Sequence, residues 1–301
     1  MTMRRFSPPL LALLLSVCFV PAHSQTIKQL FGFGCDPATK LCRDGKSPNS
    51  LIEGSDGNYY GTTEFSGGEK GASGTVFKVT SAGQLTSLYT FLPDQNNKYP
   101  NGQIPTSLVE GNDGFLYGTT QAGGASGSGV VFKLSKAGGI KVLHNFCSMA
   151  NCGDGFSPVA LTLASDGNLY GGTFGDGGVG GNVFRITPAG SFTILHSFDS
   201  VKEGPMILGL IQASDGNLYG TTVGAQTFLT CVFRLTRGGK FTLLQTFHYG
   251  QFTDSAPIQA SNGKLYAALS RFKRLSELDF PFALRYQSGS QEGFLSAEAD
   301  I

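Results

Sequence analysis

The sequence is poor in charge and lacks any sustained helical pattern. Of its 301 residues, 22 are Lys or Arg and 21 are Asp or Glu, which leaves a net charge of +1. This balance gives no electrostatic basis for binding nucleic acid or an anionic membrane surface. Beyond the N-terminus, no apolar run is long enough to cross a bilayer, and no window repeats apolar residues at helical spacing. The sequence therefore predicts no nucleic-acid partner, no membrane span and no helical fold class.

The motifs of common catalytic sites are also missing. The chain has no Ser-His-Asp order, no Cys-His nucleophile arrangement and no phrase with the ligand spacing of a metal site. The sequence therefore predicts no cofactor, no metal and no catalytic residue of these types.

The N-terminus has the organisation of an export signal. Arg4 and Arg5 form a positive segment, an apolar segment follows at 10–20, and Ala22-His23-Ser24 is a small-x-small cleavage site. We predict a cleaved signal peptide at 1–24 and a secreted, periplasmic or cell-surface protein.

What the sequence does contain is one short phrase that occurs five times. An Asp-Gly pair is followed, after two further residues, by Tyr and then by a small residue. The repeated residues are Asp56, Gly57 and Tyr60; Asp113, Gly114 and Tyr117; Asp166, Gly167 and Tyr170; Asp215, Gly216 and Tyr219; and, in a worn fifth copy where Asn262 replaces Asp, Gly263 and Tyr266. Recurrence at a spacing of about 50 residues indicates a repeat architecture.

Each repeat divides into four short apolar runs. The Asp-Gly pair lies between the first and second runs, and this is a strong hairpin signal because a type I′ turn needs positive φ at both central residues. In the first repeat a Gly-rich loop at 66–74 leads to the third run at 75–79, and a tight turn at 81–83 leads to the fourth at 85–91. The pattern predicts four antiparallel strands per repeat.

Four-stranded antiparallel sheets repeated around an axis are the blades of a β-propeller. We therefore predict an all-β fold, a β-propeller with five four-stranded blades, in one domain at 25–287. The blades are expected at about 45–91, 102–146, 155–198, 204–247 and 254–287. A strand at 26–33 is expected to complete the fifth blade and close the ring without an open edge, followed by a C-terminal tail at 288–301. The alternative is that the tail supplies the fourth strand of the fifth blade and the ring stays incomplete.

Four of the six Cys form two close pairs, each just before an Asp-Gly: Cys35 with Cys42, and Cys147 with Cys152. In an oxidising compartment such pairs form local disulfides, each worth about 2–3 kcal/mol. The alternative is a site in which four thiolates bind a metal, although these spacings are poor for zinc. Cys231 is expected to be a buried free thiol, and Cys18 leaves with the signal peptide.

The phrase Ser-Asp-Gly-Asn-Leu-Tyr-Gly-Thr-Thr, the Gly-rich loop, the run Val-Phe-Lys/Arg-Leu and the closing Phe together resemble a known repeat. It is the GloVer (Gloeo/Verruco-type) tandem repeat of choice-of-anchor exported bacterial proteins, and the resemblance covers about residues 26–287. The insertion between Phe146 and Gly155 is similar to the Cys-containing connection of that family. The resemblance implies an exported propeller and supplies no catalytic residues.

Several repeated side chains have a structural and a functional interpretation. The Asp of the phrase fits a turn, and the Tyr fits packing between blades better than a platform for sugar rings. His144 and His196 share a position with aromatic residues, which argues against a metal ligand. The third run carries a basic residue in every repeat, for which we predict local pairing rather than an anion-binding ring; these are Lys78, Lys133, Arg185, Arg234 and Arg285.

The end of the first run is the one polar position that suggests catalysis. It reads Glu53, Glu110, Leu163, Gln212 and Gln259 through the five repeats. Two carboxylates on adjacent blades can act as acid and base, as glycoside hydrolysis requires. Leu163 interrupts the series, so the alternative is a solvated lining of the channel.

These observations favour a monomeric, exported, non-enzymatic propeller that acts as a binding or interaction scaffold for a glycan or protein ligand. Two alternatives stay open. One is a polysaccharide-active enzyme, a glycosidase or a lyase, with Glu53 and Glu110 at the channel. The other is a structural or adhesive surface repeat.

Overall fold

The computed structural model describes residues 29–35, 42, 44–65, 71–175, 180–199, 202–204, 206–223, 230–247, 251–252, 255–267 and 270–271. In this part of the chain the regular elements are β-strands, with a single short 3-10 helix at Ala150–Cys152. No helix in these residues is long and apolar enough to cross a membrane.

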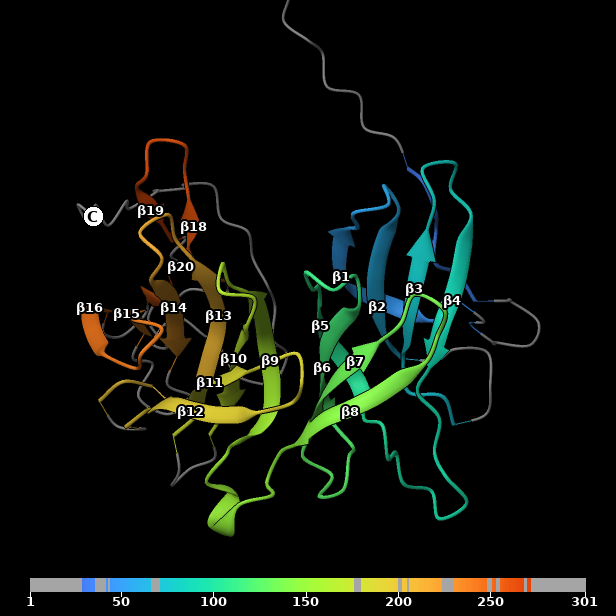
Figure 1. The fold of residues 1–301 in the computed structure, drawn as a ribbon, viewed down its shortest axis with the longest axis horizontal. Helices are drawn as coiled ribbons and strands as arrows, with labels where there is room; N and C mark the ends of the chain where they lie inside the picture. Colours follow the sequence, from blue (N-terminus) through green and yellow to red (C-terminus); the bar gives the residue numbers. More distant parts are fainter. Residues whose placement is uncertain are drawn as a thin grey trace, which may run out of the picture.

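Each of the first four repeats folds into four consecutive antiparallel strands (Figure 1). Unit 1 comprises β1 (Lys46–Glu53), β2 (Tyr59–Phe65), β3 (Thr75–Val79) and β4 (Leu85–Thr90). Unit 2 comprises β5 (Gln103–Glu110), β6 (Leu116–Ala122), β7 (Val130–Leu134) and β8 (Ile140–Asn145). Unit 3 comprises β9 (Phe156–Leu163), β10 (Leu169–Phe174), β11 (Asn182–Ile186) and β12 (Phe192–Ser197). Unit 4 comprises β13 (Met206–Gln212), β14 (Leu218–Val223), β15 (Thr230–Leu235) and β16 (Phe241–Phe247).

The fifth unit is represented by two short strand pairs. Strand β18 (Ile258–Gln259) pairs with β19 (Leu265–Tyr266), and β17 (Gln251–Phe252) pairs with β20 (Ser270–Arg271). These pairs correspond to the two ends of the first hairpin in the other units. The predicted third strand of this unit, the signal peptide at 1–24 and the tail at 288–301 lie outside the described residues.

The first strand of each unit lies beside the first strand of the next. Strand β1 contacts β5, β5 contacts β9 and β9 contacts β13, so these strands line the inside of the array while the fourth strands lie toward its outside (Figure 1). Units 3 and 4 are additionally joined by one residue pair between β10 and β13, Phe174 with Met206. The prediction of an all-β fold made of four-stranded antiparallel sheets is confirmed.

Two positions of the repeated phrase require glycine, each for a different physical reason. Gly57 has φ of +73°, the left-handed conformation that the hairpin turn requires. Gly61 lies under an aromatic ring: a Cβ there would lie 2.4 Å from Cζ of Phe77 on β3 and 2.4 Å from the carbonyl oxygen of Ser50 on β1. The Gly after the Tyr therefore allows the Phe of the third run to pack flat on the second strand.

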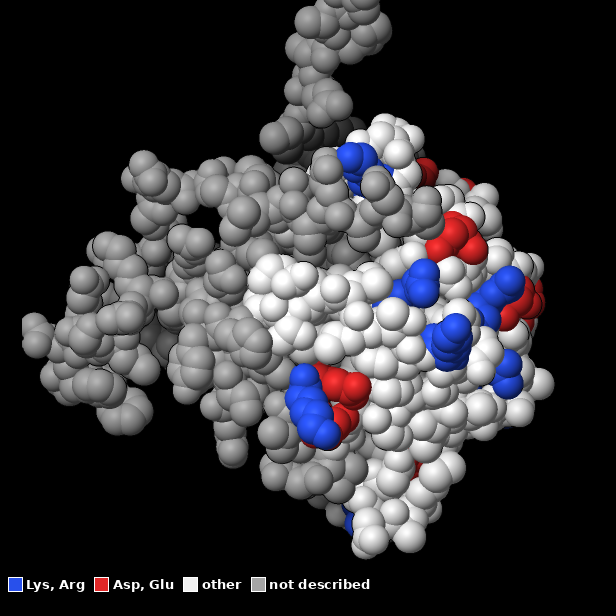
Figure 2. Space-filling view, turned by 90° about the vertical axis from the view of Figure 1, so that its left-hand side faces the viewer, with Lys and Arg blue, Asp and Glu red and all other residues white. Residues whose placement is uncertain are grey.

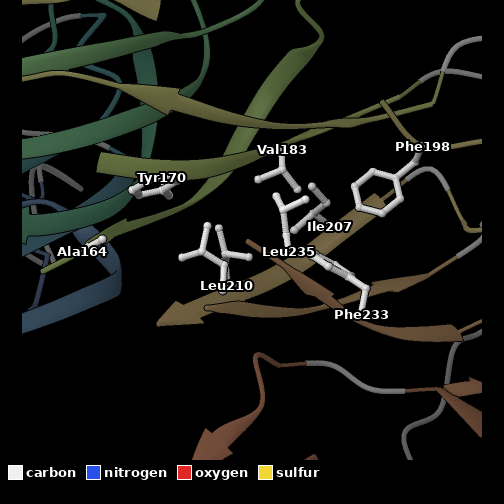
Figure 3. Packing of buried hydrophobic residues seen from close by; sticks show 9 residues of the cluster. Ala164, Tyr170, Val183, Phe198, Ile207, Leu210, Phe233 and Leu235 are labelled. Atoms are coloured by element: carbon white, nitrogen blue, oxygen red, sulfur yellow. The ribbon is translucent and has the colours of Figure 1, made fainter. Parts of the chain in front are cut away.

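The apolar core lies between the units. A buried Phe after the fourth strand packs on the Phe of the third strand in the following unit, with ring centroids 5.2–5.5 Å apart. The pairs are Phe91 with Phe132, Phe146 with Phe184, and Phe198 with Phe233. Figure 3 shows the cluster between units 3 and 4, where Phe198, Ile207 and Phe233 are buried together. Neighbouring sheets therefore stabilise one another by apolar burial.

The described N-terminal segment, residues 29–35, packs on unit 1 as a fourth strand packs on the next unit elsewhere. Phe33 lies 4.9 Å from the ring of Phe77, as Phe91 lies on Phe132. The carbonyl oxygen of Leu30 lies 2.4 Å from where a Cβ of Gly83 would be, and the same approach joins later units. The segment thus occupies the place of a preceding fourth strand, although it is not itself assigned as one.

Candidate functional site

The Asp-Gly turns of successive units gather at one end of the array, which we call the turn end. Each turn follows the end of a first strand, and in units 1, 3 and 4 a hydrogen bond joins the turn to the first strand of the next unit. The turn end therefore brings together side chains that are about 50 residues apart in the sequence.

In four units the Asp of the phrase accepts a hydrogen bond from the hydroxyl of its own Tyr. The oxygen–oxygen distances are 2.7–2.9 Å, for Tyr60 with Asp56, Tyr117 with Asp113, Tyr170 with Asp166 and Tyr219 with Asp215. Hydrogen bonds from Asn58 and then from Tyr60 hold the pKa of Asp56 below its ordinary value. Burial, followed by the bond to Asp166, raises the pKa of Tyr170 to about 12. The tyrosine is thus a neutral, buried donor, and the Asp is its acceptor as well as the turn residue.

The basic residue of the third strand differs from unit to unit in its contacts. Lys133 forms an ion pair with Asp113, with Nζ 2.7 Å from Oδ2, and lies 4.1 Å from the ring centre of Phe115. Arg185 donates to Thr193, whereas its Nε and that of Arg234 are buried without a partner in the described residues. Lys133 thus pairs within its own unit, and the predicted Arg285 lies outside the described part of the chain. Figure 2 shows basic side chains lying against acidic ones at two places on one face, with largely uncharged surface between these places.

The polar residue that ends the first strand connects neighbouring units. Glu110 accepts from the backbone N–H and the hydroxyl of Ser55 in unit 1, both at 2.7 Å. Gln212 accepts from the N–H of Ser165 at 2.7 Å, and Gln259 from the N–H of Ser214 at 2.8 Å. The residue predicted to line a channel thus accepts a hydrogen bond from the preceding unit, donated by the residue just before the Asp-Gly. We call this hydrogen bond between units the clamp.

Lys136 adds a charge to the clamp between units 1 and 2. Its Nζ lies 2.7 Å from Oε1 of Glu110 and 3.6 Å from Oδ1 of Asp56, and 4.9 Å from the ring centre of Tyr60. Burial alone would raise the pKa of Glu110, but hydrogen bonds from Lys136 and Ser55 outweigh it and hold the pKa below its ordinary value. Glu110 is therefore an ionised carboxylate at neutral pH.

An open hollow of about 340 Å³ lies beside this carboxylate. Its lining comprises Ser55, Glu110, Gly111, Asn112 and Gly114. Asn112 occupies the position that Ser holds in the other units. In unit 3 the residue that would accept its N–H is Leu163, which has no acceptor and packs against an apolar cluster. Consequently Asn112 has no hydrogen bond with the described residues, and its polar groups can meet a ligand.

Glu53, the other predicted carboxylate, ends β1 at the same position in unit 1. It is exposed and has no hydrogen bond with the described residues. The fold thus brings the strands of Glu53 and Glu110 side by side at the turn end, but gives the two carboxylates different surroundings.

The two predicted edge histidines lie far from the turn phrases, at the ends of fourth strands. His144 stacks on Phe192 of unit 3 at 3.8 Å, with Nε2 3.0 Å from Oδ2 of Asp154. His196 repeats the arrangement with Phe241 and Glu203. Both are half-buried contacts between units. Among the described residues, no group of three or more potential ligands could hold a metal ion.

Both predicted disulfides are present. Cys35 is bonded to Cys42 and Cys147 to Cys152, and Cys231 is a buried free thiol. Burial raises the pKa of the Cys231 thiol above its ordinary value, so it is not a reactive thiolate.

Sequence reasoning did not identify Ser55, Lys136, Asp154 or Glu203. A signal for the first was readable, because Ser recurs directly before the Asp or Asn of the phrase in four of the five copies. Lys136 had no such signal, since the equivalent turn position holds Ser81, Pro188 and Arg237 in other units.

Four-stranded sheets that repeat around inner strands define the class: an all-β tandem-repeat protein. The model of the Gloeobacter/Verrucomicrobia repeat matches residues 47–273, and the chain belongs to this family, as the sequence resemblance indicated. No curated protein matches the chain.

Three solved structures that resemble the chain are enzymes. A gluconolactonase of Xanthomonas campestris has a TM-score of 0.51 and 12% identity, over 75% of this chain and 71% of that chain. A streptogramin B lyase has a TM-score of 0.48 and 19% identity, over 74% of this chain and 62% of that chain. A PQQ-bound aldose sugar dehydrogenase of Streptomyces coelicolor has a TM-score of 0.46 and 15% identity, over 74% of each chain. The chain thus spans less than two thirds of the lyase, and these identities show the fold alone.

The prediction of a non-enzymatic binding or interaction scaffold is wrong. It rested on the absence of linear catalytic motifs, yet the fold shared with the gluconolactonase is one that carries an enzyme. A rigid β-scaffold can assemble reactive groups from distant residues, so a missing motif does not exclude catalysis.

Proposed function

We propose that the protein is a polysaccharide-active enzyme, a glycosidase or a lyase, whose reactive groups lie at the turn end. The observation that carries this proposal is Glu110: an ionised, half-buried carboxylate that lines an open hollow. An ionised carboxylate is the form that a nucleophile or a base toward a sugar requires, although the lowered pKa makes Glu110 a weaker base than an unperturbed carboxylate.

The surroundings of Glu110 support this role. Lys136 and Ser55 hold the carboxylate in place, which limits the reorganisation needed during a reaction. Asn112, which also lines the hollow, offers amide groups that suit a sugar hydroxyl. Glu53 ends the neighbouring strand, and glycosidases need a second carboxylate as the partner acid.

The test is an assay of the purified protein on a panel of neutral and acidic polysaccharides. New reducing ends report hydrolysis, and new ultraviolet absorbance from an unsaturated sugar reports elimination. We expect Glu110→Gln to lower the rate about 100-fold or more, the usual contribution of a general acid or base.

Glu110→Gln is a well-matched variant because Gln212 and Gln259 form the same clamp with an amide. It should keep the fold, with a smaller loss of stability than Glu110→Ala, while removing the charge. Gln212→Ala is the control, since it loosens an equivalent clamp outside the hollow and should keep wild-type activity. A protein inactive on the whole panel, or full activity in Glu110→Gln, would contradict the proposal and favour a structural or adhesive repeat.

The finer architecture is also a proposal. We infer one domain at 25–287 with five blades, in which the N-terminal segment is the fourth strand of the fifth. The packing of Leu30 and Phe33 on unit 1 supports this arrangement. Deleting residues 26–33 should destabilise the protein, and a stability equal to that of the full chain would contradict the role of the segment.

The two disulfides and the repeat family support export from the cytoplasm. We further propose that a signal at 1–24 is cleaved and that the protein is a monomer. Mass spectrometry of the secreted protein without reduction should find a start near Gln25 and two disulfides. Recovery of uncleaved protein with free thiols would contradict this localisation.

A further inference from the structure

The two most exposed large apolar side chains in the described part of the chain lie on its first and last units. Leu51 on β1 is 64% exposed, and Ile258 on β18 is 66% exposed. The residues equivalent to Leu51 in units 2, 3 and 4 are all buried, with exposures of 2–7%: Leu108, Leu161 and Leu210. The same strand position is thus buried in three units and open in unit 1.

The buried equivalents are covered by the phrase tyrosine of the preceding unit. Leu108 shares a core cluster with Tyr60, Leu161 with Tyr117, and Leu210 with Tyr170. The phrase tyrosines of units 1 to 4 are at most 2% exposed, whereas Tyr266 of unit 5 is only half-buried. Leu51 therefore lacks a tyrosine, and Tyr266 lacks the leucine of a following unit.

The polar clamp shows the same complementarity. Glu110, Gln212 and Gln259 each accept the N–H of a Ser in the preceding unit. Glu53 is the acceptor at this position in unit 1, and Ser261 is the matching donor in unit 5. Both are exposed, and neither has a hydrogen bond with the described residues.

We propose that unit 5 docks on unit 1 through this surface, within one chain. Leu51 packs on Tyr266, as the equivalent residues do at the interfaces 1/2, 2/3 and 3/4. Glu53 accepts the N–H of Ser261, as the equivalent residues do at the interfaces 1/2, 3/4 and 4/5. Ile258 is covered by unit 1, as its counterpart Ile211 is covered where unit 4 meets unit 5. This interface extends the five-blade architecture and is independent of whether the turn end catalyses a reaction.

The occupant of the open face of unit 1 follows from three features. Unit 5 carries the phrase Tyr, which every other unit has, and the Ser before the Asp or Asn, which donates at the interfaces 1/2, 3/4 and 4/5. Unit 5 already packs on unit 4 through Leu265 and Tyr219, so it is the last unit of the array. On unit 1, Leu30 and Phe33 occupy the place that the fourth strand of a preceding unit takes elsewhere. A preceding unit is therefore expected on this face of unit 1.

Amide hydrogen exchange measured by NMR on the full mature protein tests the clamp residue by residue. The N–H of Ser261 should be protected like that of Ser55, whereas Asn112, whose acceptor is replaced by Leu163, is a built-in exposed control. Glu53→Ala should accelerate exchange at Ser261 about tenfold or more, with Ser55 unchanged. Glu110→Ala should do the reverse.

A second measurement covers the case in which Glu53→Ala does not fold. Leu51→Ala should lower the urea midpoint about as much as Leu108→Ala if the docked interface exists, and leave it nearly unchanged if Leu51 is exposed. The proposal is overturned if Ser261 exchanges as fast as Asn112, or if Leu51→Ala is neutral. Protection of Ser261 that increases with protein concentration would also overturn it, because the contact would then form between chains.

Discussion

The interface between units 1 and 2 and the interface between units 2 and 3 have the same geometry but opposite chemistry at the turn end. The first is joined by Glu110 with Ser55 and Lys136. The second has Leu163 and Pro188 at the equivalent positions, and Leu163 packs with apolar residues. Toward the outside both interfaces use the same buried Phe pair. The comparison indicates that apolar packing holds the units together, while the turn end is free to vary and to carry function.

The largest expected effect concerns the part that the two interfaces share. Phe91→Ala and Phe146→Ala should each destabilise the protein by about 3–5 kcal/mol, because each removes a fully buried ring and leaves a cavity. Urea unfolding measures both. A loss in one variant only would show that the two apolar contacts are not equivalent.

The next largest effect is expected at the interface between units 1 and 2 alone. Glu110→Ala should cost about 1–3 kcal/mol, since it leaves the Ser55 N–H and Lys136 without their acceptor. Glu110→Gln should cost less, because an amide forms the same clamp in unit 4. Urea midpoints of the two variants and of Gln212→Ala check this order. An unchanged midpoint in Glu110→Ala would mean that the clamp contributes nothing to stability.

The two interfaces should also respond to acid in different pH windows. Burial lowers the pKa of His144 below its ordinary value of 6.5, against the opposing effect of Asp154, so the unfolded chain takes up this proton first. The stability that depends on His144 is therefore lost as pH falls below about 6.5. The pKa of Glu110 is also lowered, from an ordinary value of 4.5, and its contribution is lost as pH falls below that value.

Urea midpoints measured against pH check these windows. His144→Gln, which introduces the residue found at Gln245, should flatten the curve just below pH 6.5 and leave the more acidic limb. Glu110→Gln should do the opposite. Identical curves for both variants and the wild type would contradict the assignment of the two windows.

The smallest effect is expected from a substitution that restores the clamp at the interface between units 2 and 3. Leu163→Gln exchanges partly buried apolar surface for a hydrogen bond to the Asn112 N–H, so stability should change by about 1 kcal/mol or less. Exchange of the Asn112 amide should slow about tenfold. An unchanged exchange rate would show that the clamp depends on more than this acceptor.

Repeated patterns made the units predictable, and differences between repeats limited what could be read about the site. Asp-Gly pairs and alternating apolar runs depend on local conformation, so the four-stranded hairpins followed from the chain itself. The contacts of Glu110 with Ser55 and Lys136 join residues 55 and 26 positions apart, and no local rule pairs them. The prediction of a non-enzymatic scaffold failed for the same reason, because sequence motifs report only reactive groups that lie close in the chain.

The sequence by itself determined the repeat, the turns, the disulfide pairs and the family, because each depends on short-range spacing. Only the tertiary structure decided what the polar residues do. In the folded protein the Asp of the phrase accepts a hydrogen bond from a buried tyrosine. Glu110, predicted to line a channel, accepts a hydrogen bond from the neighbouring unit and lies ionised beside an open hollow. These roles depend on which unit packs against which, and that packing is set by apolar burial between sheets rather than by any single repeat.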